Sequence, residues 1–432
     1  MSDRPYAASH APPPPVSGPA SGRASEPASD QAAGARRRTG GARLAQVDAL
    51  RGFALFGILM VNITYMASAY HGTGLEDPGL GGPLSEAVRW VVAVLFEAKF
   101  FLLFSFLFGY SFTLQIDSAE RRGDRFAPRF LRRLAGLFVI GAVHAVILFP
   151  GDILTLYAVL GLVLLALRRV PPRTAVRIAA ALLVVTAVAY ALLALAAWQS
   201  GADGVVPPST ATAAAEATEA LRGGPAPVIG AHLDQLPDMA LLLVFFQAPS
   251  ALAAFLLGLA AGRRRALADT GAHQRFLRRL QWTGFTVGLL GGVVYATVSL
   301  NHPAYQVGAL GLDVVTAPLL AAAYAATVLR LVHGRRGRAV VAALAPAGRM
   351  SLTNYLGQSL AGVLLFTGVG AALVGRVPPV GVVAIALALF AAQAAASGWW
   401  LRRHAYGPLE WLLRAWTTLS APPWRPRPSP RP

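Results

Sequence analysis

Apolar runs of roughly twenty residues recur along most of the 432-residue chain, separated by short polar segments rich in arginine. Runs of this length match the hydrocarbon thickness of a bilayer, and their spacing predicts about ten transmembrane helices. The predicted spans cover residues 47–67, 87–115, 131–149, 152–168, 174–198, 237–261, 281–300, 308–332, 348–372 and 378–401. The predicted fold class is therefore all-α, a polytopic membrane helix bundle.

The polar stretches outside these runs predict the remaining organisation. Residues 1–43 are rich in Pro, Ala, Ser and Gly, a composition that cannot bury a core and predicts a disordered tail. The helical bundle is expected over 44–405, with a polar Ala/Thr/Glu-rich loop at about 199–236. Residues 406–420 are typical of an interfacial amphipathic helix with Trp411 and Trp416 at headgroup depth. A second disordered tail, 421–432, would follow.

Charge sets the expected orientation. The net charge is +18, and Lys99 is the single lysine among 38 basic residues. With both termini in the cytoplasm, almost every arginine cluster falls on the inner side, and only Arg89, Arg222 and Arg376 remain outside, as the positive-inside rule requires. We therefore assign the basic charge to topology and contact with the lipid bilayer, and expect no nucleic-acid partner. The absence of cysteine excludes disulfides and thiolate chemistry.

Glu97, Lys99 and Asp313 lie inside predicted spans, where ionisable residues are functional candidates by default. Glu97 and Lys99 are two positions apart in "FEAKF". Residues at that spacing do not face each other on a helix, so each needs another partner or a bend in the helix. Asp313, in the eighth span, is the partner we suggest for Lys99.

His144 and Asp152 flank a predicted tight turn at "FPGD" between the third and fourth spans. A carboxylate near a neutral imidazole could fix its tautomer and make His144 a general base. The structural alternative is that His144 binds a backbone carbonyl while Asp152 caps the following helix. Asp152 could do both.

The first span holds further polar groups. Asp48 and Arg51 are three apart, so a local ion pair is expected, although Arg51 could instead bind an anionic group from the cytoplasm. Asn62 lies deep enough to need a partner on a neighbouring helix or a substrate carbonyl. His71 falls just beyond the span, in a wetter position.

The segment "GRMSLTNYLGQSL" opens the ninth span with Arg349 and a polar stripe of Ser351, Asn354 and Gln358. The stripe is typical of hydrogen bonds between helices. Arg349 could alternatively join Arg51 in a layer that faces an anion.

Several motifs resemble one family. "VDALRGFALFGILMVN", "RRLAGLFVIGAVHAVILFPGDILTLYAVLG", "GRMSLTNYLGQSL" and "YGPLEWLLRA" occur in the order found in the YeiB-like bacterial inner-membrane proteins. The resemblance covers about residues 44–420 and implies a C-terminal family domain of unknown function at about 250–420. It also implies a multi-pass protein of the bacterial cytoplasmic (inner) membrane.

The first-helix pattern D-x-x-R-G, followed by Asn and His, is more distantly similar to transmembrane acyltransferases such as heparan-α-glucosaminide N-acetyltransferase. That likeness implies that Asn62 and His71 match a catalytic Asn and His, with a spacing shorter by a couple of residues. It also implies transfer of an acyl group from cytoplasmic acetyl-CoA or another acyl-CoA to a small-molecule acceptor hydroxyl or amine across the membrane.

The residues fit that reaction as follows. Arg51, Arg132, Arg133 and Arg349 would bind the donor phosphates, Asn62 would polarise the thioester, and His71 or His144 would act as base, with Asp152 orienting His144. No metal is expected. A transporter using Glu97, Lys99 and Asp313, or a non-catalytic membrane scaffold, are the alternatives; the oligomeric state is not predicted.

Overall fold

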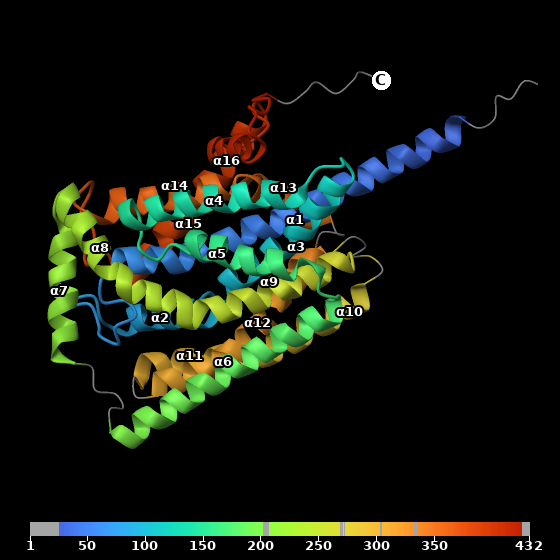
Figure 1. The fold of residues 1–432 in the computed structure, drawn as a ribbon. Helices are drawn as coiled ribbons and strands as arrows, with labels where there is room; N and C mark the ends of the chain where they lie inside the picture. The colour runs from blue at the N-terminus through green and yellow to red at the C-terminus, as the bar shows by residue number, and fades with distance from the viewer. Residues whose placement is uncertain are drawn as a thin grey trace, which may run out of the picture. The chain divides into compact units, whose positions relative to one another are not determined.

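The computed structural model describes residues 26–425, apart from 202–206, 268–270, 272, 303–304 and 332–334. The chain divides into two units, residues 1–43 and 44–432, and the fold described below is that of the second. The helices are α1 (Glu26–Ala67), α2 (Pro83–Leu95), α3 (Lys99–Glu120), α4 (Phe126–Ile147), α5 (Ile153–Ala166), η1 (Leu167–Arg169), α6 (Pro172–Ser200), α7 (Pro208–Arg222), α8 (Pro225–Leu241), η2 (Leu242–Gln247), α9 (Ala248–Arg263), α10 (Gln274–Thr283), η3 (Gly284–Gly288), α11 (Leu289–Asn301), α12 (Gln306–Leu331), α13 (Arg335–Arg349), α14 (Ser351–Phe366), α15 (Pro379–Leu401) and α16 (Pro408–Thr418). Regular structure in the described residues is entirely helical, as predicted (Figure 1).

Eight helical segments of the described chain are long and apolar enough to cross a membrane, so the protein is a multi-pass membrane protein. The two other predicted spans form shorter helices, α5 with 14 residues and α14 with 16. A straight crossing needs about 20 residues. Asp152 and the prolines at 171 and 172 limit α5, and α14 begins only after Met350.

Apolar side chains on the outside of the bundle support this assignment. Helix α6, at the lower edge of the view in Figure 1, has only 17% of its most apolar stretch buried. Val184, Val185, Val188 and Leu192 are all more than half exposed on it. Such a stripe is costly in water but matches lipid tails.

The interior is held together by close approach of helix backbones. A Cβ atom at Gly109 of α3 would lie 2.0 Å from the carbonyl oxygen of Phe255 in α9. A Cβ at Gly258 of α9 would lie 2.1 Å from the carbonyl oxygen of Phe106 in α3. These reciprocal glycines permit the contact, as small residues commonly do between membrane helices.

The segment 199–236 differs from the predicted loop, because it contains α7 and most of the α8 helix. Both helices have proline in the first turn, where the missing N–H costs nothing, and alanine-rich sequence follows in α7. The polar composition of this segment predicted a loop, but its alanine content favours helix. Similarly, α1 begins at Glu26, inside the stretch 1–43 that was expected to be disordered. Residues 1–25 and 426–432 of the two predicted tails lie outside the described residues.

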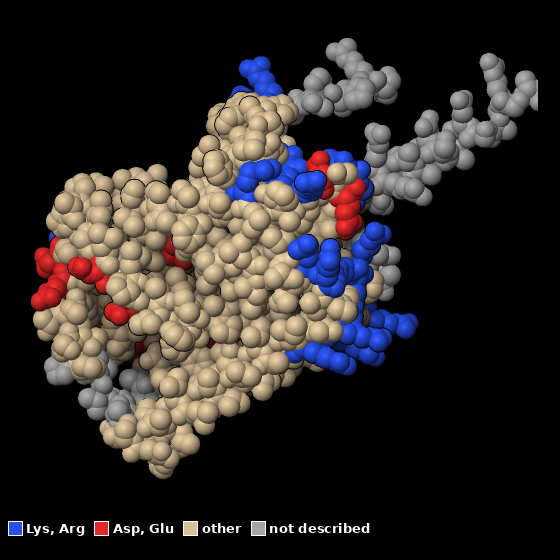
Figure 2. Space-filling model, viewed as in Figure 1, with Lys and Arg blue, Asp and Glu red and all other residues tan. Residues whose placement is uncertain are grey.

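Charge is segregated along the second unit. In Figure 2, arginine side chains gather at the end where α10 and α13 lie, which we call the basic end. Acidic side chains gather at the opposite end, near α7 and α8, and a smaller acidic group lies among the arginines of the basic end.

Candidate functional site

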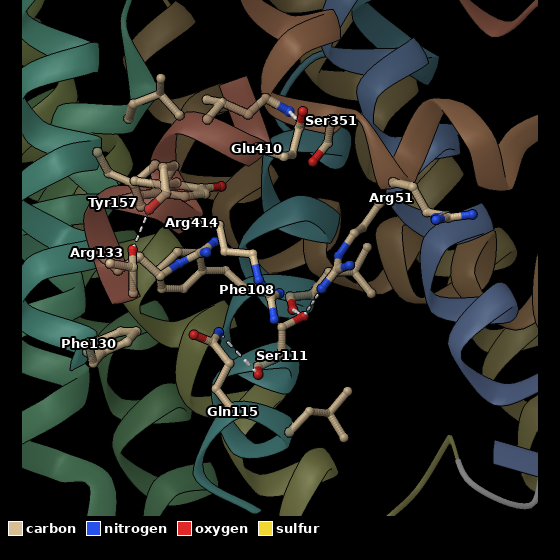
Figure 3. Close-up of a pocket in the computed structure, with 18 of the residues that line it drawn as sticks. Arg51, Phe108, Ser111, Gln115, Phe130, Arg133, Tyr157, Ser351, Glu410 and Arg414 are labelled. Atoms are coloured by element: carbon tan, nitrogen blue, oxygen red, sulfur yellow. Dashed lines mark hydrogen bonds between the residues drawn. The ribbon is translucent and has the colours of Figure 1, made fainter. Parts of the chain in front are cut away.

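A cavity of about 560 Å³ opens among α1, α3, α4, α14 and α16, and we call it the arginine cavity (Figure 3). Six arginines line it, against a single lining carboxylate, Glu410. The six are Arg51, Arg122, Arg129, Arg133, Arg349 and Arg414. The predicted donor residues Arg51, Arg133 and Arg349 are among them, while Arg122, Arg129 and Arg414 were not singled out from the sequence.

Half of these arginines have a carboxylate partner. Arg51 pairs with Asp48 at 2.9 Å, as the sequence indicated, and also donates a hydrogen bond to the Ser111 hydroxyl. Arg122 and Arg129 lie 3.3 and 3.2 Å from the exposed carboxylate of Asp124.

The other half make no ion pair within the described residues. The Nε atom of Arg133 is buried without a hydrogen-bond partner. Arg414 lies over the ring of Tyr406, 4.9 Å from its centroid, and Arg349 reaches only the carbonyl of Ala405, at 3.4 Å. A guanidinium group without an ion pair can bind an anionic ligand by donating two parallel hydrogen bonds to two of its oxygens.

The wall carrying Glu410 and Arg414 is the short helix α16. Glu410 accepts hydrogen bonds from the backbone N–H groups of Leu352 and Thr353, at 2.7 and 3.1 Å, and from the Thr353 hydroxyl at 2.6 Å. It therefore caps the start of α14, whose first N–H groups have no partner within the helix. One carboxylate against six guanidinium groups leaves the lining of the cavity strongly positive in formal charge.

Arg132 does not line the arginine cavity, unlike its neighbour Arg133. Its Nε atom donates to the carbonyl of Thr417 at 3.0 Å, and its own carbonyl accepts from the Trp416 indole at 2.7 Å. Arg132 thus attaches α16 to α4. Because adjacent positions on a helix point in different directions, Arg133 faces the cavity while Arg132 contacts α16.

A second cavity of about 280 Å³ lies next to the first, and we call it the aromatic cavity. Ile58, Ile153 and Tyr355 line both, so these three residues form the partition between them. Asn62 lines the aromatic cavity, as do the carboxylates Glu97 and Asp313. The hydroxyl of Tyr355 is buried.

The intramembrane charges sit at a break between α2 and α3. Ala98 has a φ of 63°, a conformation unfavourable for residues other than glycine, and it interrupts the helix between Glu97 and Lys99. Lys99 is fully buried and donates to Asp313 at 3.1 Å, which confirms the suggested pairing. Glu97 accepts instead from the Tyr295 hydroxyl at 3.0 Å.

His71 lies in the loop after α1, beside the aromatic cavity. Its Nε2 atom is 3.9 Å from a Glu97 oxygen and 3.5 Å from the Thr64 hydroxyl, and its ring meets the Tyr65 ring edge-on at 4.3 Å. Burial, with the Arg89 guanidinium as a second cause, lowers the pKa of His71 from 6.5 to about 4. The imidazole is therefore neutral at pH 7 and able to accept a proton.

His144 and Asp152 are brought together as predicted, with Nδ1 and Oδ1 2.9 Å apart and both side chains almost completely buried. That contact is an ion-pair distance without the geometry of a hydrogen bond. The other Asp152 oxygen caps α5 by accepting from the Thr155 N–H at 2.7 Å, so the predicted capping role is confirmed. His144 Nε2 lies 2.8 Å from the hydroxyl of Ser359, a neighbour that the sequence did not indicate.

Neither His144 nor Asp152 lines either cavity. The His144 ring does lie 5.0 Å from the ring of Tyr355, in the partition. The structure therefore separates the predicted catalytic residues into two groups: Asn62 and His71 around the aromatic cavity, and the buried His144–Asp152 pair behind Tyr355.

The polar stripe of α14 divides in the same way. Asn354 donates to Ser397 at 2.9 Å and Gln358 to Gln393 at 3.0 Å, both on α15, which is the helix-to-helix bonding expected. Ser351 instead lines the arginine cavity. Among the residues that the structure describes, no group of three His, Asp or Glu side chains is arranged to hold a metal ion.

Comparison with known proteins gives a consistent assignment. Residues 261–420 match the family described as "Protein of unknown function (DUF418)". The chain is 34% identical over 399 residues to the uncharacterized protein YxaH of Bacillus subtilis (strain 168), covering 89% of this chain and 96% of that protein. It is 28% identical over 394 residues to the uncharacterized protein YeiB of Escherichia coli (strain K12), covering 87% and 97% of the two. No solved structure matches. The chain therefore belongs to the YeiB-like family of membrane proteins with a DUF418 domain.

Proposed function

We propose that the protein is a membrane-embedded acyltransferase. It takes an acyl group from an acyl-CoA in the arginine cavity and passes it to a small-molecule acceptor hydroxyl or amine in the aromatic cavity. The observation that carries this proposal is the pair of adjacent cavities, one lined by six arginines and one containing Asn62, separated only by Ile58, Ile153 and Tyr355.

The donor fits the arginine cavity in charge and in size. The phosphates of coenzyme A need several cationic donors, and Arg133, Arg349 and Arg414 make no ion pair with a carboxylate of the part of the chain that the structure describes. A volume of 560 Å³ lies within the range of about 300–1,000 Å³ typical of ligand sites. The deeper wall, with Phe104, Phe108 and Tyr157, is apolar enough for the pantetheine arm and the acyl chain.

The transfer step belongs at the partition and in the aromatic cavity. The Asn62 amide would polarise the thioester carbonyl, and neutral His71 would take the acceptor proton, with Glu97 stabilising the imidazolium that forms. His144 is the second candidate base, because Asp152 and Ser359 lie 2.9 and 2.8 Å from its two nitrogens, a carboxylate beside an imidazole as in other general bases. In either case the loss of the base would cost about 10²- to 10⁴-fold in rate.

The proposed site also has consequences for the location and orientation of the protein. A CoA thioester is a cytoplasmic compound, so the basic end would face the cytoplasm of a bacterium, in agreement with the positive-inside rule. The protein would then lie in the bacterial inner membrane.

Transport is the second candidate, favoured by the buried Lys99–Asp313 pair next to a cavity. It predicts no dependence on acyl-CoA, so one experiment separates the two functions.

The test is the binding of acetyl-CoA and longer acyl-CoAs to the purified full-length protein, by isothermal titration calorimetry. Arg133→Gln and Arg349→Gln should each weaken binding about tenfold or more, because a hydrogen bond to a charged group contributes about 1.5–3 kcal/mol. The matched control is Arg89→Gln, since Arg89 pairs with exposed Glu76 at 2.7 Å and lies outside the cavity. No binding by the wild type, or equal binding by all variants, would contradict the proposal.

Turnover can then be followed through the thiol of released coenzyme A. The chain has no cysteine, so a thiol reagent reports the product alone. His71→Gln and His144→Gln identify the base: we expect the larger loss of rate in His71→Gln, with donor affinity unchanged. A wild-type rate in His71→Gln would assign the base to His144.

A further inference from the structure

The wall of the aromatic cavity is unusually rich in rings. Nine aromatic residues line its 280 Å³, contributed by α1, α3 and the break before it, the turn before α5, α6, the π-helical η2, α11 and α14. They include Tyr65, Phe96, Phe101, Phe149, Tyr190 and Phe246. An irregular stretch of helix such as η2 places Phe246 at the cavity, and π-helical turns are often found at functional sites.

The charge of this cavity is negative. Glu97 and Asp313 both line it, whereas the one lysine, Lys99, is fully buried behind Asp313 and bonded to it. Two carboxylates against one ammonium leave a formal charge of −1 among these three groups. Glu97 receives one hydrogen bond, from Tyr295, and within the described residues its ion-pair distances include no lysine or arginine, only the His71 imidazole, which is neutral at pH 7.

A carboxylate without an ion-pair partner of its own, surrounded by aromatic rings, favours a ligand that carries an ammonium group. The π-faces of Tyr and Phe attract ammonium groups, and such rings are the usual means of recognising alkylated ammonium ligands. A metal ion fits poorly, because the described residues provide no set of three ionisable ligands. A polyol fits poorly too, because Asn62, Gln247 and Ser250 supply few hydrogen-bonding groups.

We infer that the aromatic cavity is a binding site for a small organic cation, a primary or methylated ammonium with an apolar body, held by Glu97 and the surrounding rings. The binding itself is independent of the donor cavity. It rests on the proposed function only in identifying this cation as the acyl acceptor or a part of it.

The experiment compares charged ligands with neutral ligands of the same shape. Choline is paired with 3,3-dimethylbutan-1-ol and butylamine with butan-1-ol, and each is titrated into the purified wild-type protein without acyl-CoA. We expect at least one cation to bind about tenfold or more tightly than its neutral partner, since the ring faces and the Glu97 carboxylate attract only the charged ligand. Equal affinity within both pairs, or no binding of either cation, would overturn the inference.

Glu97→Gln keeps the size of the side chain and an oxygen that accepts from Tyr295, but removes the charge. It should abolish the preference for the cation. Glu76→Gln, which removes an exposed carboxylate outside the cavity, should leave it unchanged. Acyl-CoA titration of the same preparation separates the two proposals, because donor binding without cation binding contradicts only the inference made here.

Discussion

Asp152 serves two neighbours at once, and its variants can separate the two roles. One oxygen caps α5 and the other lies against His144. Asp152→Asn keeps a cap, since Asn and Asp are equivalent there, whereas Asp152→Ala loses it. We predict that Asp152→Ala lowers the free energy of unfolding by about 1 kcal/mol more than Asp152→Asn.

Thermal unfolding of the purified protein, followed by tryptophan fluorescence, measures this difference. Equal melting temperatures for the two variants would show that the cap contributes nothing.

His71 gives the protein a predictable response to acid. Its pKa is about 4 in the folded protein, against 6.5 for an exposed histidine. Between those pH values the unfolded chain binds more protons than the folded one, so stability is full above pH 6.5 and falls as the pH drops toward 4. We predict a shallower fall of melting temperature in His71→Gln than in the wild type. Parallel curves between neutral pH and the folded-state pKa would contradict the assignment.

Among single residues of the candidate site, the sequence identifies charged ones better than neutral ones. An ionisable group inside an apolar run is conspicuous, and the need for a partner led from Lys99 to Asp313. Ser359 and Tyr355 carry no such signal, because serine and tyrosine are ordinary in membrane helices. Their importance arises only from the atoms that folding places beside them, His144 and the two cavities.

Helix α3 packs against α9 through glycines that tolerate no side chain. A Cβ at Gly258 would lie 2.1 Å from a backbone oxygen, which cannot move aside easily, whereas a Cβ at Gly398 in α15 would meet nothing within 4 Å. We predict that Gly258→Ala lowers the melting temperature strongly. Gly398→Ala should leave it unchanged or raise it, since alanine favours helix by up to about 1 kcal/mol over glycine.

The same two variants, purified in parallel, provide the comparison. A Gly258→Ala protein as stable as Gly398→Ala would contradict the packing described for α3 and α9.

Hydropathy located the long helices well but not where helices break. Within the apolar run at 87–115 only the spacing of Glu97 and Lys99, and not hydropathy, pointed to a bend, and the predicted span at 348–372 became the shorter α14. The break at Ala98 depends on partners of Glu97 and Lys99 in α11 and α12. The start of α14 depends on Glu410 of α16, which accepts from the Leu352 N–H although it is 58 positions away in the sequence. Contacts this distant in sequence leave no periodic pattern to read.

For the whole molecule, the distribution of charge predicts a single orientation in the membrane. The cysteine-free chain allows single cysteines to be introduced at exposed positions, Glu216→Cys in α7 and Arg121→Cys after α3. In intact cells a membrane-impermeant maleimide should label Glu216→Cys and should label Arg121→Cys only after the cells are opened. The reverse pattern would place the arginine cavity outside the cytoplasm.

The central claim is that the arginine cavity holds a coenzyme A thioester through its phosphates. The most direct measurement is the dissociation constant of the purified wild-type protein for acetyl-CoA, acetyl-dephospho-CoA and acetylpantetheine, in one buffer of fixed salt. We predict that affinity falls at each step as phosphate is removed, and that Arg133→Gln flattens the series. Equal affinity for the three compounds, or binding of none, would contradict the account.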